Sequence, residues 1–217
     1  FNEKEVDEIV IFDITATKEK RTPNYKKIEE IAEEAFMPFA YGGGINSLSQ
    51  IEKLFKLGIE KVVINSALST NLNLITEAAN IFGSQSIVAS IDVKKDWLGK
   101  QQAYTVSGSK KVKTPLLAFI QQIEESGAGE LFINSIDLDG TFSGYDYSLI
   151  SKISEASSLP LVICGGAKQA SDFLTAVQHG ASAVAASSMF VYQGAQKGIL
   201  ISYPSQEKLV TEVYQHI

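Results

Sequence analysis

Residues 39–47, FAYGGGINS, change from an apolar run to three consecutive glycines, and residues 162–170, VICGGAKQA, make the same change. Gly42 and Gly43 stand 123 positions before Gly165 and Gly166. The same step carries Asn65 to Ser188, which also follow apolar runs. A pattern doubled at this distance predicts two equivalent halves.

Composition limits the classes of partner. The chain has 217 residues, of which 45% are hydrophobic, and 19 basic residues against 25 acidic ones give a net charge of −6. We therefore expect no nucleic-acid partner and no anionic membrane, although a local anion site is compatible with this charge. No apolar run reaches the roughly 18 residues of a membrane span, and the first residues do not resemble a signal peptide.

Cysteine and histidine are scarce. Cys164 is the single cysteine, and the chain has two histidines. An intrachain disulfide framework is excluded, and a zinc site built from the usual ligands is not expected. We therefore predict a reduced, cytoplasmic protein with neither a metal nor a cofactor.

Short β-branched runs alternate with stretches of helical period. The runs predicted as strands are residues 7–15, 38–43, 61–66, 86–93, 130–137, 159–166 and 181–190. The predicted helices are residues 24–35, 47–58, 71–83, 115–127, 145–157, 169–180 and 205–217. Strands apolar on both faces are typical of a parallel sheet covered by helices. The irregular residues 94–114 are predicted to be an insertion or a hairpin.

This alternation is compatible with a doubly wound sheet or with an eight-stranded barrel. Seven strands are one short of eight, and residues 1–9 read like the end of a helix that runs straight into a strand. Adding about 35 residues for one βα unit brings the chain to the usual barrel size of about 250. We expect a single-domain (βα)8 TIM barrel over residues 1–217, with its first strand missing from the chain.

A step of 123 residues is half of such a circle, so the doubled glycines would end two opposite strands. There, glycines allow backbone N–H groups to approach an anion, and the following helix adds a partial positive charge. Two phosphate sites facing each other across the barrel mouth would suit a substrate phosphorylated at both ends. The alternative is that these glycines only terminate the strands tightly.

Several motifs resemble the cyclase subunit of imidazole glycerol phosphate synthase. They are DITAT (13–17), GGGINS (42–47), VINSA (63–67), FGSQSIVASIDVKK (82–95), GAGELFINSIDLDGTFSGYD (127–146), CGGA (164–167) and AASSMF (185–190). The resemblance implies a (βα)8 barrel that closes an imidazole ring on a bis-phosphorylated nucleotide. It also implies a glutaminase subunit as partner, which supplies ammonia.

The resemblance implies a role for each matching residue. Asp92 corresponds to one of two catalytic aspartates; the other would end the absent first strand. The alternative is that Asp92 is a strand-end carboxylate that caps or pairs with Lys94. One phosphate site corresponds to Gly44, Asn65 and Ser66, beside Gly43, and the other to Asp139, Gly140, Gly166, Ser187 and Ser188. Asp13 and Asp137 end strands and are expected to support loops through hydrogen bonds to the backbone.

Charged residues mark the opposite end of the predicted barrel. Glu8, Lys61 and Glu130 each stand just before a strand and should gather at the amino-terminal end. A charge there is ordinarily a solvated strand start. The resemblance places a ring of charges around an ammonia-channel entrance at these three positions. This implies that a glutaminase subunit docks on this face.

Two differences from the family's sequence leave the identity of the substrate undecided. Cys164 stands where the family usually has serine, and residues 190–209 differ from the expected histidine-pathway tail. The tail is more similar to homologues associated with surface polysaccharide, in which ammonia would amidate a sugar. A third hypothesis is a non-catalytic scaffold that keeps the phosphate sites. The related sugar-phosphate isomerase barrels share the half-repeat, but SIDLDGTFSGYD and the charged ring favour the cyclase.

Overall fold

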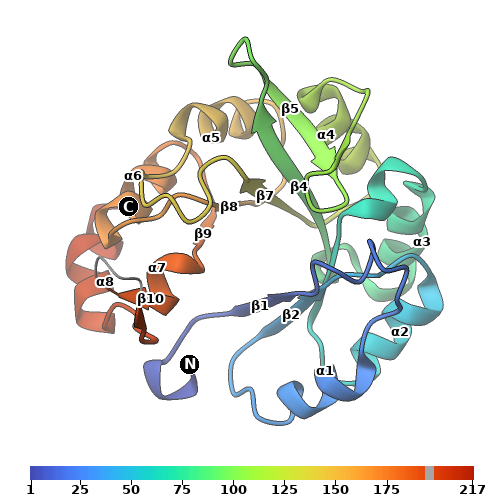
Figure 1. Ribbon diagram of the computed structural model, residues 1–217, viewed down its shortest axis with the longest axis horizontal. Helices are drawn as coiled ribbons and strands as arrows, with labels where there is room; N and C mark the ends of the chain where they lie inside the picture. Colours follow the sequence, from blue (N-terminus) through green and yellow to red (C-terminus); the bar gives the residue numbers. More distant parts are fainter. Residues whose placement is uncertain (194–197) are drawn as a thin grey trace.

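A computed structural model describes residues 1–193 and 198–217, and a curled parallel sheet forms its centre (Figure 1). Seven strands lie side by side in chain order and are all parallel. They are β1 (Ile9–Phe12), β2 (Phe39–Gly42), β3 (Lys61–Ile64), β4 (Ile87–Lys95), β7 (Glu130–Ser135), β8 (Leu161–Cys164) and β9 (Ala183–Ala185).

Helices follow the strands and cover the outside of the curled sheet (Figure 1). The α-helices are α1 (Tyr25–Ala32), α2 (Leu48–Lys56), α3 (Asn73–Phe82), α4 (Leu116–Glu125), α5 (Tyr147–Ser154), α6 (Ala170–Gln178), α7 (Ser188–Val191) and α8 (Gln206–Glu212). Short 3-10 helices are η1 (Asn2–Lys4), η2 (Ser66–Ser69), η3 (Ser84–Ser86) and η4 (Tyr214–His216). The glycines predicted to end helices, Gly58, Gly83, Gly127 and Gly180, all have positive φ, as expected of C-terminal caps.

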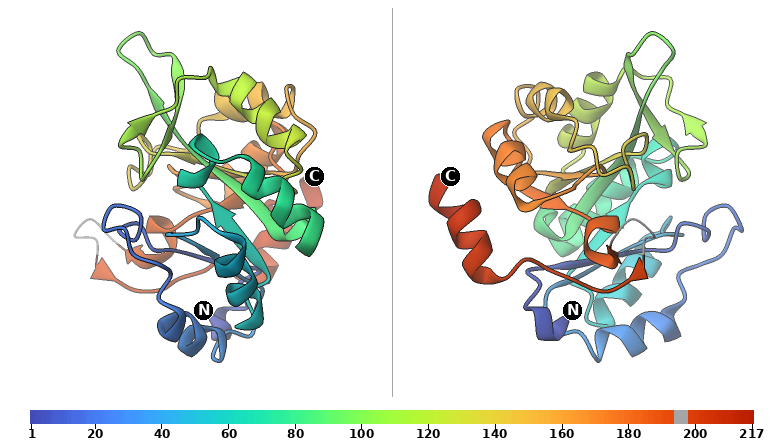
Figure 2. Two further views of the ribbon diagram at one scale, coloured as in Figure 1. Left: turned by 90° about the vertical axis from the view of Figure 1, so that its right-hand side faces the viewer. Right: turned by 60° about the vertical axis from the view of Figure 1, so that its left-hand side comes forward.

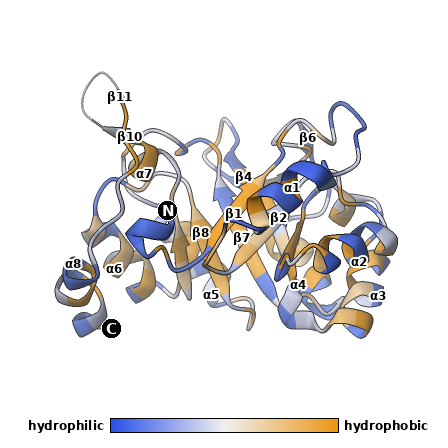
Figure 3. Ribbon diagram, turned by 90° about the horizontal axis from the view of Figure 1, so that it is seen from below, coloured by the Kyte–Doolittle hydropathy of each residue, from blue (hydrophilic) through white to orange (hydrophobic). Residues whose placement is uncertain are grey.

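The apolar residues form two clusters, one on each face of the sheet. The larger cluster joins the helices to outward strand residues such as Val62, Ile87 and Leu131. The smaller cluster, Ala40, Val63, Val88 and Phe132, lines the inside of the curl. Figure 3 shows the strands as an apolar centre, with the polar residues on the surrounding elements. Both strand faces are therefore buried, which explains the nearly continuous apolar runs in the sequence.

The irregular segment after β4 is a hairpin, as predicted. β4 continues past the parallel sheet and pairs antiparallel with β5 (Gln101–Thr105), which pairs with β6 (Lys110–Lys111). Figure 2 shows this hairpin projecting beyond the body of the molecule. It leaves the carboxyl end of β4, so it lies beside the mouth of the curled sheet.

The fold class is confirmed as a (βα)-barrel type, and β1 and β9 are the two ends of the described sheet. An eighth strand between them stays a prediction, as does the single-domain assignment. The strand predicted over residues 181–190 is wrong in its second half, where Ser188–Val191 form α7.

The carboxyl-terminal segment folds back along the barrel. Residues 190–209, whose sequence differs from the expected histidine-pathway tail, contain β10 (Tyr192–Gln193) and β11 (Gly198–Ile199). Residues 194–197 lie outside the described residues. The hydroxyl of Tyr203 donates to Asp7, 2.7 Å away, which joins the tail to the start of the chain. Among the described residues, no helix is both long enough and apolar enough to cross a membrane.

A step of 122 residues relates the two halves of the sheet. It carries the paired residues Ile9 and Phe39 of β1 and β2 to Leu131 and Leu161, which pair in β7 and β8. The step of 123 suggested by the sequence is therefore wrong by one residue, because two glycines can be aligned with three in either of two ways. The equivalent positions are Gly43 with Gly165, Gly44 with Gly166, and Asn65 with Ser187.

Backbone geometry supports this correction. Asn65 has φ −118° and ψ −68°, and Ser187 has φ −114° and ψ −66°. Each residue directly precedes a one-turn helix at the carboxyl end of its strand. The two halves thus repeat the same bend at the same place in the barrel.

Candidate active site

Along the inner face of the strands, the side chains change from charged to apolar to polar between the amino-terminal and the carboxyl-terminal end. Because side chains alternate between the faces of a strand, every second residue points inward. These residues, from the amino to the carboxyl end, are Lys61, Val63 and Asn65 from β3, and Glu130, Phe132 and Asn134 from β7. The inside is therefore charged at its amino-terminal end, apolar in the middle and polar at its carboxyl end.

Asp92 lies at this polar end, where β4 leaves the parallel sheet. It pairs with Asn134 of β7 on one side and with Tyr104 of β5 on the other. Its Oδ1 accepts a hydrogen bond from Asn134 Nδ2 at 3.3 Å. Its Oδ2 accepts from the backbone N–H of Gly108 at 3.0 Å and from Asn65 Nδ2 at 3.4 Å. The side chain is buried, with 7% exposed.

Burial and hydrogen bonding have opposite effects on this carboxyl. Removal from water raises the pKa of Asp92, and the bonds from Asn134, Gly108 and Asn65 lower it without fully compensating. Lys94 also favours the charged form. The net effect is a raised pKa, the direction in which a carboxyl becomes a better proton donor near neutral pH.

The glycines of the first half each have a neighbour that excludes a side chain. A Cβ on Gly43 would lie 2.5 Å from the carbonyl oxygen of Asp13, and one on Gly44 would lie 2.7 Å from that of Arg21. Both residues also have positive φ, a conformation that favours glycine. The alternative reading, tight termination against the preceding loop, therefore has a physical basis, and it does not exclude anion binding.

A cavity of about 340 Å³ lies beside this first glycine turn. Gly44 and Ser66 line it, whereas Gly43 and Asn65 do not. Three cationic side chains also line it: Lys20, Arg21 and Lys110. Positively charged side chains beside a glycine turn are suited to binding a phosphate group. The cavity thus brings together part of the predicted site with three cations that the sequence reasoning missed.

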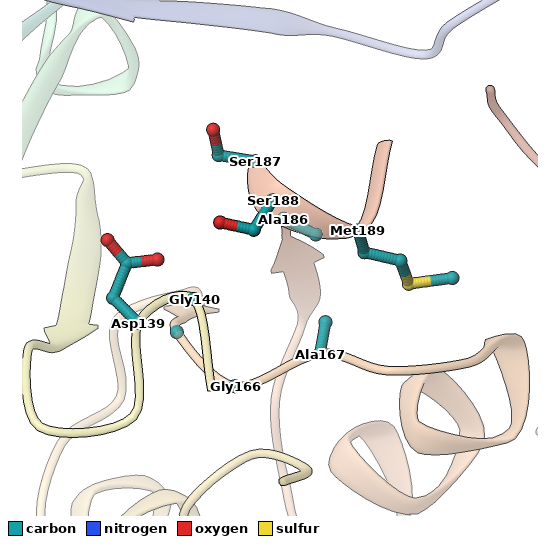
Figure 4. A pocket seen from close by; sticks show the side chains of 9 residues that line it. Asp139, Gly140, Gly166, Ala167, Ala186, Ser187, Ser188 and Met189 are labelled. Carbon is teal, nitrogen blue, oxygen red and sulfur yellow. The ribbon is translucent and has the colours of Figure 1, made fainter. Parts of the chain in front are cut away.

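The second predicted phosphate site forms one cluster. Figure 4 shows Asp139, Gly140, Gly166, Ser187 and Ser188 around a single narrow pocket between the β7, β8 and β9 loops. The side chains of Ser188 and Asp139 point toward each other, whereas Ser187 points away from Gly166. The cavity measures about 10 Å³, which is room for about one water molecule. A phosphate group would need these side chains to move apart.

The glycines of this second turn are equally constrained. A Cβ on Gly165 would lie 2.5 Å from the carbonyl oxygen of Ser135, and one on Gly166 would lie 2.1 Å from that of Gly144. Gly166 also accepts a hydrogen bond from the N–H of Gly144 at 2.8 Å. The β7–α5 loop is thereby held directly against the β8 turn.

Asp13 accepts backbone hydrogen bonds from the loop that follows β1, whereas Asp137 accepts one from the last residue of β4. Asp13 accepts from the N–H groups of Thr15 and Ala16 and forms a 3.1 Å ion pair with Arg21. Burial raises the pKa of Asp13, but the bonds from Arg21 and Thr15 outweigh it and the net pKa is lowered. Asp137 accepts from the N–H of Lys95 at 2.8 Å.

The three charged residues meet at the amino-terminal end. Lys61 Nζ lies 2.9 Å from Glu130 Oε2 and 3.1 Å from Glu8 Oε2. Burial opposes the charge of Lys61, but the two glutamates outweigh it, Glu130 more than Glu8, and its pKa is raised. The cluster lies at the end opposite Asp92, separated from it by the inner apolar layer.

Cys164 ends β8 next to the second glycine turn. Burial raises the pKa of its thiol to about 12, and the negative charge of Asp139 adds to this effect. The thiol is therefore protonated at neutral pH and is a poor nucleophile. Within the described residues, no group of three or more histidine, cysteine, aspartate or glutamate side chains is arranged to hold a metal ion.

Fold and site together define a (βα)-barrel protein whose polar groups, as usual for this class, gather at the carboxyl ends of the strands. The family described as "Histidine biosynthesis protein" matches residues 1–197. The chain belongs to this family.

Named relatives extend over most of the chain. The "Putative imidazole glycerol phosphate synthase subunit hisF2" of Pseudomonas aeruginosa is 45% identical over 210 residues, covering 96% of this chain and 84% of that protein. The "Imidazole glycerol phosphate synthase subunit HisF" of Petrotoga mobilis is 44% identical and covers 86% of this chain and 75% of its own length. The subunit of the same name from Helicobacter hepaticus is 39% identical, covering 94% and 80%.

Proposed function

We propose that this chain is the cyclase subunit of an imidazole glycerol phosphate synthase and acts in histidine biosynthesis. The observation that carries the proposal is Asp92, a buried carboxylate held by three donors at the carboxyl end of the barrel. Family membership and relatives of this name support it.

The reaction would add ammonia to a carbonyl group, remove water and eliminate the rest of the nucleotide. Each of these steps moves a proton near neutral pH, so a carboxyl with a raised pKa is suited to them. In this proposal Asp92 exchanges protons with the substrate. The inner apolar layer beneath it separates the reacting atoms from the charged residues at the amino-terminal end.

The two phosphate groups of the substrate would bind on opposite sides of Asp92. One would enter the cavity beside Gly44 and Ser66, where Lys20, Arg21 and Lys110 provide positive charge. The other would open the narrow pocket around Gly166 and Ser188. Gly43, Asp139, Gly140 and Ser187 belong to the same proposal as parts of these two turns.

We also propose that a glutaminase subunit docks at the amino-terminal end of the barrel. Glu8, Lys61 and Glu130 would then surround the point at which ammonia enters. The partly buried ion cluster supports this, because a strand start ordinarily carries only solvated side chains, whereas here three charged side chains from three strand starts form ion pairs with one another.

A direct assay tests the proposal. The full-length protein is given the bis-phosphorylated aminoimidazole carboxamide ribonucleotide and an ammonium salt, and imidazole glycerol phosphate is measured. We expect turnover without the partner, because added ammonia enters from solvent. Binding of the nucleotide without any turnover would instead favour the non-catalytic scaffold.

A second candidate is the amidation of a sugar for surface polysaccharide. The sequence of residues 190–209 favours it, because this tail is more similar to that of homologues associated with surface polysaccharide than to the histidine-pathway tail. Failure of the nucleotide to bind, together with adjacent genes for polysaccharide assembly, would support this candidate over histidine biosynthesis.

A further inference from the structure

We propose that Asn65 and the turn at residues 106–108 hold the catalytic carboxylate of Asp92 in position, and that the side chain of Asn65 positions this carboxylate rather than binding a phosphate group. The inference rests on the proposed function only where turnover is measured. It links the hairpin that follows β4 to the reacting group.

The side-chain amide of Asn65 is fully engaged inside the barrel. Its Nδ2 donates to the carbonyl oxygen of Ser90 at 3.0 Å and to Asp92 Oδ2 at 3.4 Å. Its Oδ1 accepts from the backbone N–H of Val106 at 3.0 Å. Both donor hydrogens are thus assigned to protein acceptors. A phosphate could bind this amide only by displacing one of these bonds.

The turn that Asn65 holds is strained. Val106 has φ 56° and Ser107 has φ 51°, a left-handed conformation that is rare for β-branched side chains. Such strain persists where the surroundings impose it and is concentrated at functional sites. Here the constraint is visible: Ser107 Oγ donates to the carbonyl oxygen of Ile14 at 2.9 Å, and Lys94 Nζ donates to that of Gly108 at 2.9 Å.

The strained turn presents one group to Asp92. The N–H of Gly108 lies 3.0 Å from Oδ2, the same oxygen that faces Asn65. Among the described residues, Asn134 is the one donor to Oδ1. Two donors on Oδ2 stabilise negative charge there, which leaves Oδ1 as the oxygen that exchanges a proton with the substrate.

Few charged groups face this carboxyl. On its own strand, Lys94 lies nearby, with its ammonium 5.2 Å above the ring of Tyr104, the β5 partner of Asp92. The groups that contact Asp92 from β3, β7 and the turn are the neutral Asn65, Asn134 and Gly108. Loss of the Asn65 contacts therefore changes the pKa of Asp92 through hydrogen bonding, with the nearby charges unchanged.

The first experiment replaces Asn65 by alanine in the full-length protein. The titration of Asp92 is followed by carbon-13 carboxyl NMR, which needs no substrate. We expect the pKa of Asp92 to rise, because two bonds that favour the charged form are lost or loosened. With the nucleotide and ammonium salt, we expect kcat to fall about 10-fold or more and KM to change less than about 3-fold. A large rise in KM with kcat and the pKa unchanged would make the side chain of Asn65 a phosphate ligand and overturn the proposal.

A second variant tests the turn without touching Asn65. Val106→Gly removes the left-handed strain, so the protein should unfold at a higher urea concentration. Because the turn is then freer to move, the pKa of Asp92 should shift in the same direction as in Asn65→Ala, and kcat should fall. Glu5→Gly is the matched control: Glu5 also has a left-handed φ of 52°, but it ends η1 at the start of the chain.

The control should stabilise the protein and leave both the pKa of Asp92 and kcat unchanged. If Val106→Gly behaves in the same way as Glu5→Gly, the turn is only a strained connection, and the positioning role is refuted. Because the NMR readout needs no turnover, this result is distinguishable from a failure of the proposed cyclase activity.

Discussion

The ring of Phe12 occupies the space that a side chain on Gly42 would need. A Cβ at residue 42 would lie 2.9 Å from Phe12 Cδ1 and 3.0 Å from the carbonyl oxygen of Val63. The Phe12 ring reaches across the inside of the curled sheet to meet Phe132 edge-on, with 5.2 Å between the ring centres. The first of the three consecutive glycines is therefore explained by packing inside the barrel.

This relationship predicts that Gly42→Ala destabilises the protein. Unlike Gly43 and Gly44, Gly42 does not have a positive φ, so the main effect is the steric conflict of the added Cβ with the Phe12 ring and the carbonyl oxygen of Val63. Overpacking of this kind typically costs about 1–3 kcal/mol, which urea unfolding can measure. The double variant Gly42→Ala with Phe12→Ala should recover part of the loss. Equal stability of Gly42→Ala and the parent protein would contradict the packing described.

Asp92→Asn is expected to abolish most turnover while leaving nucleotide binding largely intact. The substitution keeps the shape of the side chain and removes its proton exchange. With ammonia supplied as a salt, kcat should fall by roughly 10²-fold or more, the usual scale for a general acid or base. Normal turnover under these conditions would show that Asp92 is structural.

Lys61→Ala should reduce turnover to different extents with the two sources of ammonia. Glutamine-dependent turnover with the glutaminase subunit should fall far more than turnover with an ammonium salt, since free ammonia can enter from the open mouth. Lys56→Ala is a suitable control because Lys56 forms only an exposed ion pair with Glu52 on α2. Equal losses in both assays of Lys61→Ala would mean that Lys61 only stabilises the barrel.

Ser188→Glu should weaken binding of a bis-phosphorylated ligand. The longer, negatively charged side chain would fill a pocket that already faces Asp139 and would repel phosphate. Calorimetry should show a loss of about 10-fold or more in affinity, equivalent to about 1.4 kcal/mol. Ser84→Glu, at an exposed serine before β4, adds the same charge at the other end of the barrel and should bind normally. Unchanged binding by Ser188→Glu would remove this pocket from the phosphate assignment.

Asp146 predicts a pH-dependent contribution to stability. It caps α5 by accepting from the N–H of Leu149 and pairs with Lys95 at 2.9 Å. Burial raises the pKa of Asp146, but bonds from Ser148 and Lys95 and the cap outweigh it, so its pKa lies below the ordinary 3.8. The stabilisation is present above the unfolded pKa and disappears as the pH falls through the lowered folded value.

Asp146→Ala should therefore lose about 1 kcal/mol at neutral pH, the typical value of a cap, with little added by the half-exposed lysine. The difference from the parent protein in urea unfolding should shrink as the pH falls below about 4. A difference that stays constant over this range would show that the carboxylate charge contributes nothing.

The order of strands and helices could be predicted because each element has a local signal. Apolar runs and terminal glycines identified seven parallel strands and their helices, and the break in periodicity after β4 located the hairpin. The end of β9 was harder, because the short apolar run around Met189 suits a strand and a partly buried helical turn equally well. Only the packing of the whole chain decides between them.

The site was predicted in part, since its residues are joined by contacts that no spacing reveals. Asp92 ends an apolar strand, a signal that can be read directly. Asn134 was missed, although alternation places it inward beside Phe132 and Glu130. The left-handed φ of Val106 has no sequence signal, because a valine is the residue least expected there. Lys20 and Lys110 meet at one cavity only because two loops distant in sequence fold over the same opening.

The half-repeat shows that the charges on the amino-terminal face depart from two-fold symmetry. The step of 122 residues makes Glu8 equivalent to Glu130, but it carries Lys61 to Ala183, the residue that pairs with Val162 as Lys61 pairs with Ala40. Two equivalent acids thus share one base, and the approximate two-fold symmetry is broken by a single cation. A perfectly two-fold surface would accept a partner in two orientations rotated by half a turn. Because Lys61 on one side is matched by Ala183 on the other, these orientations differ in energy, so a charged partner can distinguish them.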